Sequence, residues 1–332
     1  QDVAACVKHF ALNNQECDRL SVDTKVDDKT LFELYLPAFY DALMEGGSYS
    51  VMGAYNKYDG EFCCENATLL KKILRDLWHY DGVTISDWGG VHNTEKTALN
   101  GVDMEMSVTP DFDDYKLANP LLEKVKSGKI DESVIDKRIE RILTMMERIK
   151  LGDKTRNKGC TNTKDHQQTI QQIAEEGIVL LKNDTAHLPL SKETKKILVL
   201  GDNAKRTHAA GGGSAEIKAL YDISPLLGMR MVLGGDAQID WLPGYYVDNE
   251  KHVAGEVDWQ AESLDVDYTT DRGKEQFDKE IRPIREKYLK EALDACSSYD
   301  EVIFIGGLNH AYDVEGFDRP DMTLPYGQNE VI

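Results

Sequence analysis

The first 150 residues repeat one pattern, in which a short apolar run is followed by an amphipathic stretch, and the pair occurs four times. Short apolar runs predict buried strands, and apolar positions with a period near 3.6 predict helices. Strands and helices that alternate along a chain are typical of a parallel sheet covered by helices. The predicted strands are 3–9, 50–55, 83–87 and 102–106, and the predicted helices are about 30–44, 66–78, 91–99 and 115–127.

A second α/β region follows a break in this pattern. An amphipathic helix over about 131–150 ends at Leu151-Gly152, and the polar stretch from Asp153 to His166 indicates a linker. Beyond it we expect an open α/β layer. Its predicted elements are a helix at 166–177, strands at 178–182, 196–201 and 237–242, a helix at 283–297 and a strand at 301–306, with an acidic and polar insertion at 244–281.

Charge and composition exclude several classes of protein. The formal net charge is -20, so the field of the chain repels phosphate backbones and anionic membrane surfaces, and we expect no nucleic-acid or membrane partner. The apolar runs are far shorter than the roughly 18 residues of a membrane-spanning helix. The six cysteines and eight histidines form no zinc-binding pattern, so we expect no metal and no cofactor. No targeting leader is evident at Gln1, and a periplasmic or secreted location is our expectation.

Polar residues end each of the four predicted strands of the first region. These residues are Lys8-His9, Tyr55-Asn56, Ser86-Asp87, and Asp103 with Glu105. Parallel α/β folds place their chemistry at the carboxyl ends of strands. Polar residues also end strands simply because the chain leaves the core there. Four consecutive polar ends favour a functional site.

Asp87 is the strongest candidate nucleophile. It ends a β-branched run and is followed by Trp88 and two glycines, which let a ligand approach the backbone closely. A carboxylate that attacks the anomeric carbon of a sugar needs rigid support and an apolar platform for the sugar ring, and Trp88 supplies the platform. The alternative is that Asp87 only caps the following helix.

Two further segments carry candidate groups. Lys8 and His9, with Asn13, Asn14, Glu16 and Arg19, gather hydrogen-bonding groups at one strand end that suit sugar hydroxyls; alternatively, Lys8 forms a Schiff base or the cluster is a solvated surface. Glu315, beside Phe317 on a glycine-bearing loop, suits a general acid, whereas a solvated acidic turn is the alternative. The glycines at 211–213 lack the phosphate-loop pattern and predict a sharp loop.

Together these segments resemble the family 3 glycoside hydrolases, most closely the bacterial β-glucosidases. The motifs that carry the resemblance are Lys8-His9-Phe10-Ala11 with Asn13 to Glu16 and Arg19, Val51-Met52 with Ala54-Tyr55-Asn56, Thr84 to Trp88, Gly101 to Met106, Gly177 to Asn183 with Leu188-Pro189-Leu190, Ile197 to Ala204, and Glu315 to Arg319 with Leu324-Pro325 and Gln328. The resemblance implies that Lys8, His9 and Arg19 hold sugar hydroxyls and that Met52 and Tyr55 line the same pocket. It implies Asp87 as the nucleophile and Glu315 as the acid/base.

The resemblance also implies an architecture, in which the second half of a (β/α)8 TIM-type barrel is followed by an α/β sandwich domain. The expected boundaries are 1–152 for the half barrel, 153–172 for the linker and first helix, and 173–332 for an incomplete sandwich domain. Because the family has further barrel units ahead of the Lys8-His9 strand and further sandwich strands, we expect the chain to work with the missing barrel half or with a second copy.

The implied activity is that of a retaining β-glucosidase acting on oligosaccharides, disaccharides and aryl β-glucosides. Retention requires two carboxyl groups about 5–5.5 Å apart, so we expect the second domain to bring Glu315 to Asp87. Three alternatives stay open, namely a β-xylosidase or dual-specificity enzyme of the same family, a catalytically silent sugar-binding or assembly subunit, and a Schiff-base lyase using Lys8. Trp88, where xylosidases of the family often have cysteine, favours the glucosidase.

Overall fold

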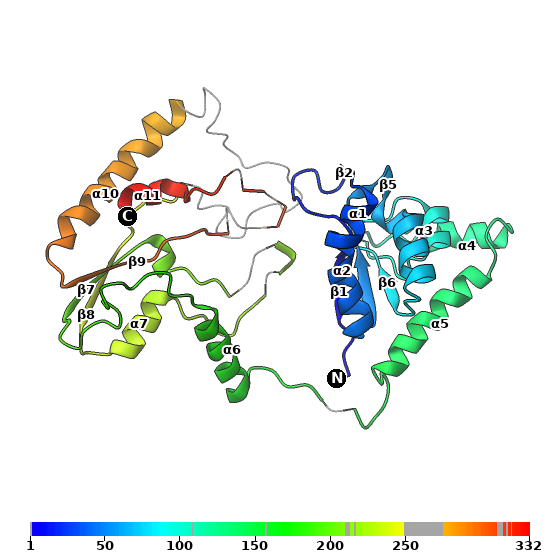
Figure 1. Cartoon of the computed structure of the whole chain (residues 1–332), viewed down its shortest axis with the longest axis horizontal. Helices are drawn as coiled ribbons and strands as arrows, with labels where there is room; N and C mark the ends of the chain where they lie inside the picture. The colour runs from blue at the N-terminus through cyan, green and yellow to red at the C-terminus, as the bar shows by residue number, and fades with distance from the viewer. Residues whose placement is uncertain are drawn as a thin grey trace. The chain divides into compact units, whose positions relative to one another are not determined.

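The computed structural model describes residues 2–107, 109–156, 158–209, 213–215, 217–248, 275–310, 315–316, 318–319 and 321–332. The chain forms two compact units, Gln1–Thr161 and Asn162–Ile332 (Figure 1). The domain boundaries predicted at 152 and 172 stay predictions.

Unit 1 is built on a parallel sheet of three strands. They are β1 (Cys6–Phe10), β3 (Ser50–Gly53) and β6 (Val83–Ile85), in the order β1-β3-β6. Val51 at the centre pairs with Val7 on one side and Thr84 on the other. The fourth predicted strand, 102–106, does not form as a regular strand. The segment makes a single isolated bridge to the sheet, between Met104 and Ile85. The reason is local: the Asp103 carboxylate accepts the Thr84 N–H at 2.8 Å, a donor that a regular ladder would use.

Helices cover this sheet and supply most of its core. One helical stretch runs through α1 (Asp28–Thr30), η1 (Leu31–Tyr35), α2 (Leu36–Tyr40) and η2 (Asp41–Glu45), and the next is η4 (Thr68–Leu77). Their apolar faces meet the sheet in one cluster, which includes Phe10, Leu31, Val51, Leu70 and Leu74. The later helices α3 (Thr94–Asn100), α4 (Asn119–Lys126) and α5 (Ser133–Arg148) pack together around Ala98, Leu121 and Ile130.

A second, small sheet lies where the chain leaves β1 and β3. It consists of β2 (Asp23–Thr24), β4 (Lys57–Tyr58) and β5 (Glu61–Phe62), in the order β2-β4-β5, and a short helix η3 (Cys63–Glu65) follows it. Two-residue strands carry no periodic pattern, so the sequence did not predict this sheet. It stands at the same edge of unit 1 as the carboxyl ends of β1 and β3.

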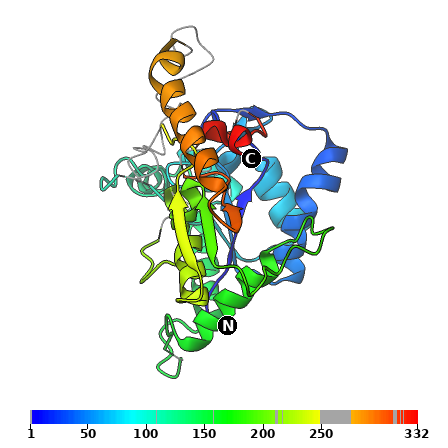
Figure 2. The same ribbon diagram turned by 90° about the vertical axis from the view of Figure 1, so that its left-hand side faces the viewer.

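Unit 2 is an α/β sandwich. Its parallel sheet has the order β8-β7-β9, with β7 (Lys196–Leu200) between β8 (Gln238–Leu242) and β9 (Glu301–Phe304), and Figure 2 shows β7 and β8 side by side. Alternate residues of β7 face opposite layers. Ile197 and Val199 pack with Leu226 of α7 (Pro225–Leu233), whereas Leu198 and Leu200 pack with Ala292 of α10 (Arg282–Cys296).

Among the described residues of unit 2, the remaining helices are shorter or peripheral. They are α6 (Lys164–Gly177), η5 (Asp202–Ala204), η6 (Gly213–Ala215), η7 (Phe277–Ile281), η8 (Pro325–Gly327) and α11 (Gln328–Val331). Helix α7 was not predicted from the sequence. Within the described residues, no helix combines the length and the apolar character needed to span a bilayer.

The strand predicted at 178–182 is wrong. Residues 178–182 form no helix or strand, and Ile178 to Leu181 are between 63% and 92% exposed. The apolar run suggested burial, but a strand also needs a hydrogen-bonded neighbour, and the described strands of unit 2 do not pair with this segment.

Candidate active site

The parallel strands of unit 1 bring three candidate residues to one edge of the sheet. His9 lies near the end of β1, Tyr55 two residues beyond β3 and Asp87 two residues beyond β6. Because carboxyl ends of parallel strands point the same way, residues far apart in the sequence meet here. Tyr55 and Asp87 are buried and His9 is half-buried.

Asp87 is held at both carboxylate oxygens. Its Oδ2 lies 3.3 Å from His9 Nε2, and its Oδ1 accepts the Trp88 N–H at 2.9 Å. It does not cap the following helix, because Asn93 does so by accepting the Lys96 N–H. The helix-cap alternative for Asp87 is therefore wrong.

His9 stays neutral more readily than an exposed histidine. Burial lowers the pKa of His9 most, Lys8 and Arg19 lower it further, and Asp87 and Glu16 act in the opposite direction. A neutral imidazole leaves the charge of Asp87 uncancelled, which suits a carboxylate that acts as a nucleophile.

We expect the His9 imidazole to titrate below its ordinary value of 6.5. The unfolded chain then binds the His9 proton more tightly than the folded chain does. The contribution of His9 to the free energy of unfolding is therefore fully present above about pH 6.5, and it is lost as the pH falls through the pKa of His9 in the folded chain. NMR titration of the ring measures this directly. The Asp87→Asn variant removes the opposing charge and should lower the pKa of His9 further; a rise in the variant would contradict the account.

Two other sugar-binding candidates, Lys8 and Arg19, lie close enough to His9 to affect its pKa. Arg19 is buried, pairs with Glu16 at 2.8 Å, and places its guanidinium 5.2 Å from the centre of the Tyr55 ring. Lys8 is exposed. An arginine stacked on a tyrosine is oriented by the ring, so its donors have a defined direction.

Met52 and Trp88 differ in exposure. Met52 is half-buried in β3, where it pairs with Ile85 of β6, the last residue of the strand that precedes Asp87. The Trp88 side chain is 45% exposed, which leaves ring surface open beside the nucleophile candidate. An exposed indole next to a buried carboxylate is the arrangement expected of a sugar platform.

Glu315 belongs to unit 2, where its Oε2 accepts the Ser214 N–H at 2.7 Å. This contact joins Glu315 to the short helix η6, and Ser214 was not among the predicted site residues. Phe317, Gly211 and Gly212 lie outside the described residues. The approach of Glu315 to Asp87 stays a prediction.

Glu65 is a supporting residue that the sequence did not single out. It is buried, and its Oε1 accepts the N–H groups of His92 at 2.7 Å and of Asn93 at 2.5 Å. These contacts fix the segment that runs from Asp87 to helix α3. The adjacent thiols of Cys63 and Cys64 are free and buried, and burial raises the pKa of Cys63 to about 12, so neither is a reactive thiolate.

Asp103 has a structural role. The sequence placed it among the polar strand ends, but its side chain is fully buried and accepts from Arg75 at 3.0 Å and from Arg141 Nε at 2.8 Å. Arg75 also donates to the carbonyls of Tyr80 and Gly82. The ion-pair network therefore holds the turn that leads into β6 and hence the strand that carries Asp87.

Comparison of this chain with known protein families identifies the family to which it belongs. Residues 1–145 match the Glycosyl hydrolase family 3 N terminal domain, and residues 178–332 match the Glycosyl hydrolase family 3 C-terminal domain. The chain belongs to glycoside hydrolase family 3. The resemblance inferred from its motifs is thereby confirmed.

Relatives and solved structures of the family are similar over nearly the whole chain. A β-glucosidase of Bacteroides ovatus is 37% identical over 99% of this chain and 43% of its own length, and a thermostable β-glucosidase B of Acetivibrio thermocellus is 34% identical over 100% and 39%. The structure of β-glucosidase 3B from Thermotoga neapolitana in complex with glucose has a TM-score of 0.71 at 29% identity, covering 97% of this chain and 43% of that one.

This family 3 chain thus spans about two fifths of the length of the relatives it matches. The family fold is a TIM-type barrel plus an α/β sandwich, and the two units carry the second half of the barrel and the sandwich.

Proposed function

We propose that this chain provides the nucleophile and part of the sugar pocket of a retaining β-glucosidase that removes terminal non-reducing β-D-glucosyl residues. The observation that carries the proposal is the buried Asp87 carboxylate, oriented at both oxygens beside His9. The printed names of the family 3 relatives, which are β-glucosidases, support the choice of glucose. Arg19 over Tyr55 and the open Trp88 ring supply donors and a platform for the sugar.

The proposed reaction is a double displacement. An oxygen of Asp87 attacks the anomeric carbon while Glu315 gives its proton to the glycosidic oxygen, so the bond to the leaving alcohol breaks and a glycosyl ester forms on Asp87. Glu315, now a carboxylate, takes a proton from water. The resulting hydroxide attacks the same carbon, releases glucose with retained configuration and restores both side chains.

The proposal also includes further barrel strands that pair with β1. In the described sheet, β1 has β3 as its one neighbour, and the sheet contains three strands where a closed barrel has eight. An unpaired parallel strand edge is a surface on which other strands pair. We propose that additional barrel strands, from the same protein or from a partner, cover β1 in the active enzyme.

Hydrolysis of nitrophenyl β-glucoside, nitrophenyl β-xyloside and cellobiose tests the proposal. We expect the glucoside to be preferred over the xyloside. In the Glu315→Gln variant, cellobiose hydrolysis should fall by about 10²- to 10⁴-fold because its sugar leaving group needs the proton, whereas the nitrophenyl glucoside should fall much less. Azide should restore glycosyl transfer in the variant.

The exposed Glu193→Gln is the matched control for this series and should change no rate. Equal losses for both leaving groups in Glu315→Gln would show that Glu315 is not the acid. Preference for the xyloside would assign the chain to the xylosidases instead.

A further inference from the structure

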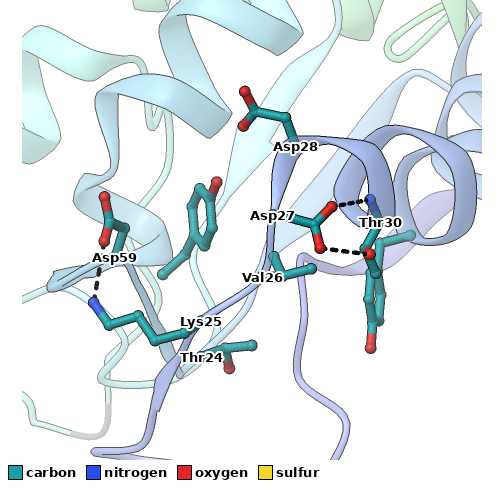
Figure 3. A pocket seen from close by; sticks show the side chains of 9 residues that line it. Thr24, Lys25, Val26, Asp27, Asp28, Thr30 and Asp59 are labelled. Atoms are coloured by element: carbon teal, nitrogen blue, oxygen red, sulfur yellow. Dashed lines mark hydrogen bonds and ion pairs between the residues drawn. The ribbon is translucent and has the colours of Figure 1, made fainter.

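Unit 1 contains a cavity that the proposed reaction does not use. Its volume is about 650 Å³, within the range of about 300–1,000 Å³ that is common for small-molecule sites. It lies between the small sheet β2-β4-β5 and the start of the helical stretch at α1, and Figure 3 shows the side chains that line it. Both walls are loops or short elements at the carboxyl ends of β1 and β3.

Most polar groups of this cavity are already paired. Both carboxylate oxygens of Asp27 accept from Thr30, as the dashed lines in Figure 3 show. Lys25 Nζ lies 2.9 Å from an oxygen of Asp23 and 3.1 Å from one of Asp59. The Tyr35 hydroxyl accepts from Asn14 at 2.8 Å. These contacts engage most of the polar side chains of the lining.

Two polar groups of the lining stand apart from this network. Tyr58 is buried, with the residue 8% exposed, whereas Asp28 is exposed and presents its carboxylate from the first turn of α1. Within the part of the chain that the structure describes, neither the Tyr58 hydroxyl nor the Asp28 carboxylate has a hydrogen-bond partner. Burial raises the pKa of Tyr58, the charges of Asp28 and Asp59 raise it further, and the charge of Lys25 lowers it.

The Tyr58 hydroxyl offers a donor and the Asp28 carboxylate offers an acceptor, and together they complement a ligand hydroxyl. A hydroxyl can accept from the Tyr58 O–H and donate to the Asp28 carboxylate at the same time. A metal ion fits less well, because Asp27 and Asp59 are already engaged, and no three metal-ligating side chains come together among the described residues. An anion is repelled by the excess of carboxylates over the single lysine of the lining.

We propose that this cavity is an accessory carbohydrate-binding site, in which Tyr58 and Asp28 bind hydroxyl groups of a neutral sugar. Tyrosine rings and carboxylates are well suited to sugars, because rings pack against C–H faces and carboxylates accept from hydroxyls. The choice of a β-glucoside as the probe rests on the proposed function, whereas the binding itself needs no catalysis.

The test is an NMR titration with cellobiose of the Asp87→Asn chain, which should not hydrolyse this sugar, followed at the backbone amides of residues 24–30 and 57–60. We expect saturable shifts at these amides. Tyr58→Phe, which removes only the unpaired hydroxyl, should weaken this binding about tenfold, and Asp28→Asn should weaken it similarly. The matched control is Tyr40→Phe, because Tyr40 does not line the cavity and packs its ring on Trp78. Circular dichroism checks that each variant folds.

Three results would overturn the proposal: no shift at residues 24–30, equal affinity in Tyr58→Phe and the parent chain, or shifts there with calcium chloride but not with cellobiose. Tyr58→Phe should also leave hydrolysis of nitrophenyl β-glucoside unchanged. Failure of the glucosidase proposal gives a different result, because hydrolysis would be absent while the shifts at residues 24–30 and their dependence on Tyr58 persist.

Discussion

Replacing Asp87 by asparagine is expected to lower hydrolysis of nitrophenyl β-glucoside by at least about 10³-fold, as removal of a catalytic nucleophile does in other enzymes. The amide keeps the shape of the carboxylate and can still accept the Trp88 N–H, so the local structure is retained. It cannot form the glycosyl ester. Binding of glucose should persist, because the proposed sugar contacts of Arg19, Tyr55 and Trp88 do not depend on the nucleophile.

The matched control for this variant is Asp76→Asn, an exposed aspartate on η4 of the same unit. It makes the same chemical change away from the sheet edge and should leave the rate within about twofold of the parent. Equal activity of Asp87→Asn and Asp76→Asn would remove Asp87 from the mechanism. The pair therefore separates a catalytic loss from a general effect of charge.

The second large effect concerns stability. Asp103→Asn should destabilise unit 1 by about 3–5 kcal/mol, because it leaves Arg75 and Arg141 without the carboxylate that balances them. Burial already lowers the pKa of Arg75, and Asp103 is the main opposing influence. Hydrogen exchange at the β6 amides should accelerate in the variant, while exchange at the β7 amides of unit 2 stays unchanged as an internal reference.

Asp81→Asn is the control for Asp103→Asn. Asp81 also pairs with an arginine, Arg148, but its side chain is 65% exposed and water screens the pair. We expect it to change stability by less than about 1 kcal/mol. If Asp103→Asn and Asp81→Asn accelerated β6 exchange equally, the buried network would not be what holds the turn before β6.

The sequence predicted the parts of the fold that depend on local periodicity. β3 and β6 lie within the predicted strands, and β1 extends one residue beyond its predicted range of 3–9, to Phe10. The amphipathic helices α5 and α10 lie within a few residues of their predicted ranges. The contact between His9 and Asp87 also follows from the pattern, because both residues come at the carboxyl ends of parallel strands. Three short strands thus suffice to place the candidate site.

Features that depend on partners far away in the sequence could not be predicted from local patterns. Asp103, like Asp87, is an aspartate near the end of a predicted strand. Its structural role follows only from its ion pairs with Arg75 and Arg141, which are distant in the sequence. Glu65 gains its role from backbone donors 27 and 28 residues away. The run 178–182 has the composition of a strand, but composition does not supply a neighbouring strand.

The most direct test of the central claim is covalent trapping of the glycosyl-enzyme. The chain, with whatever barrel strands it needs for turnover, is incubated with a 2-deoxy-2-fluoro-β-D-glucoside that carries a good leaving group, and its peptides are analysed by mass spectrometry. We predict one fluoroglucosyl adduct, on the peptide that contains Asp87, and none in the Asp87→Asn variant. An active preparation that forms no adduct at Asp87, or forms it on another residue, would contradict the assignment of Asp87 as the nucleophile.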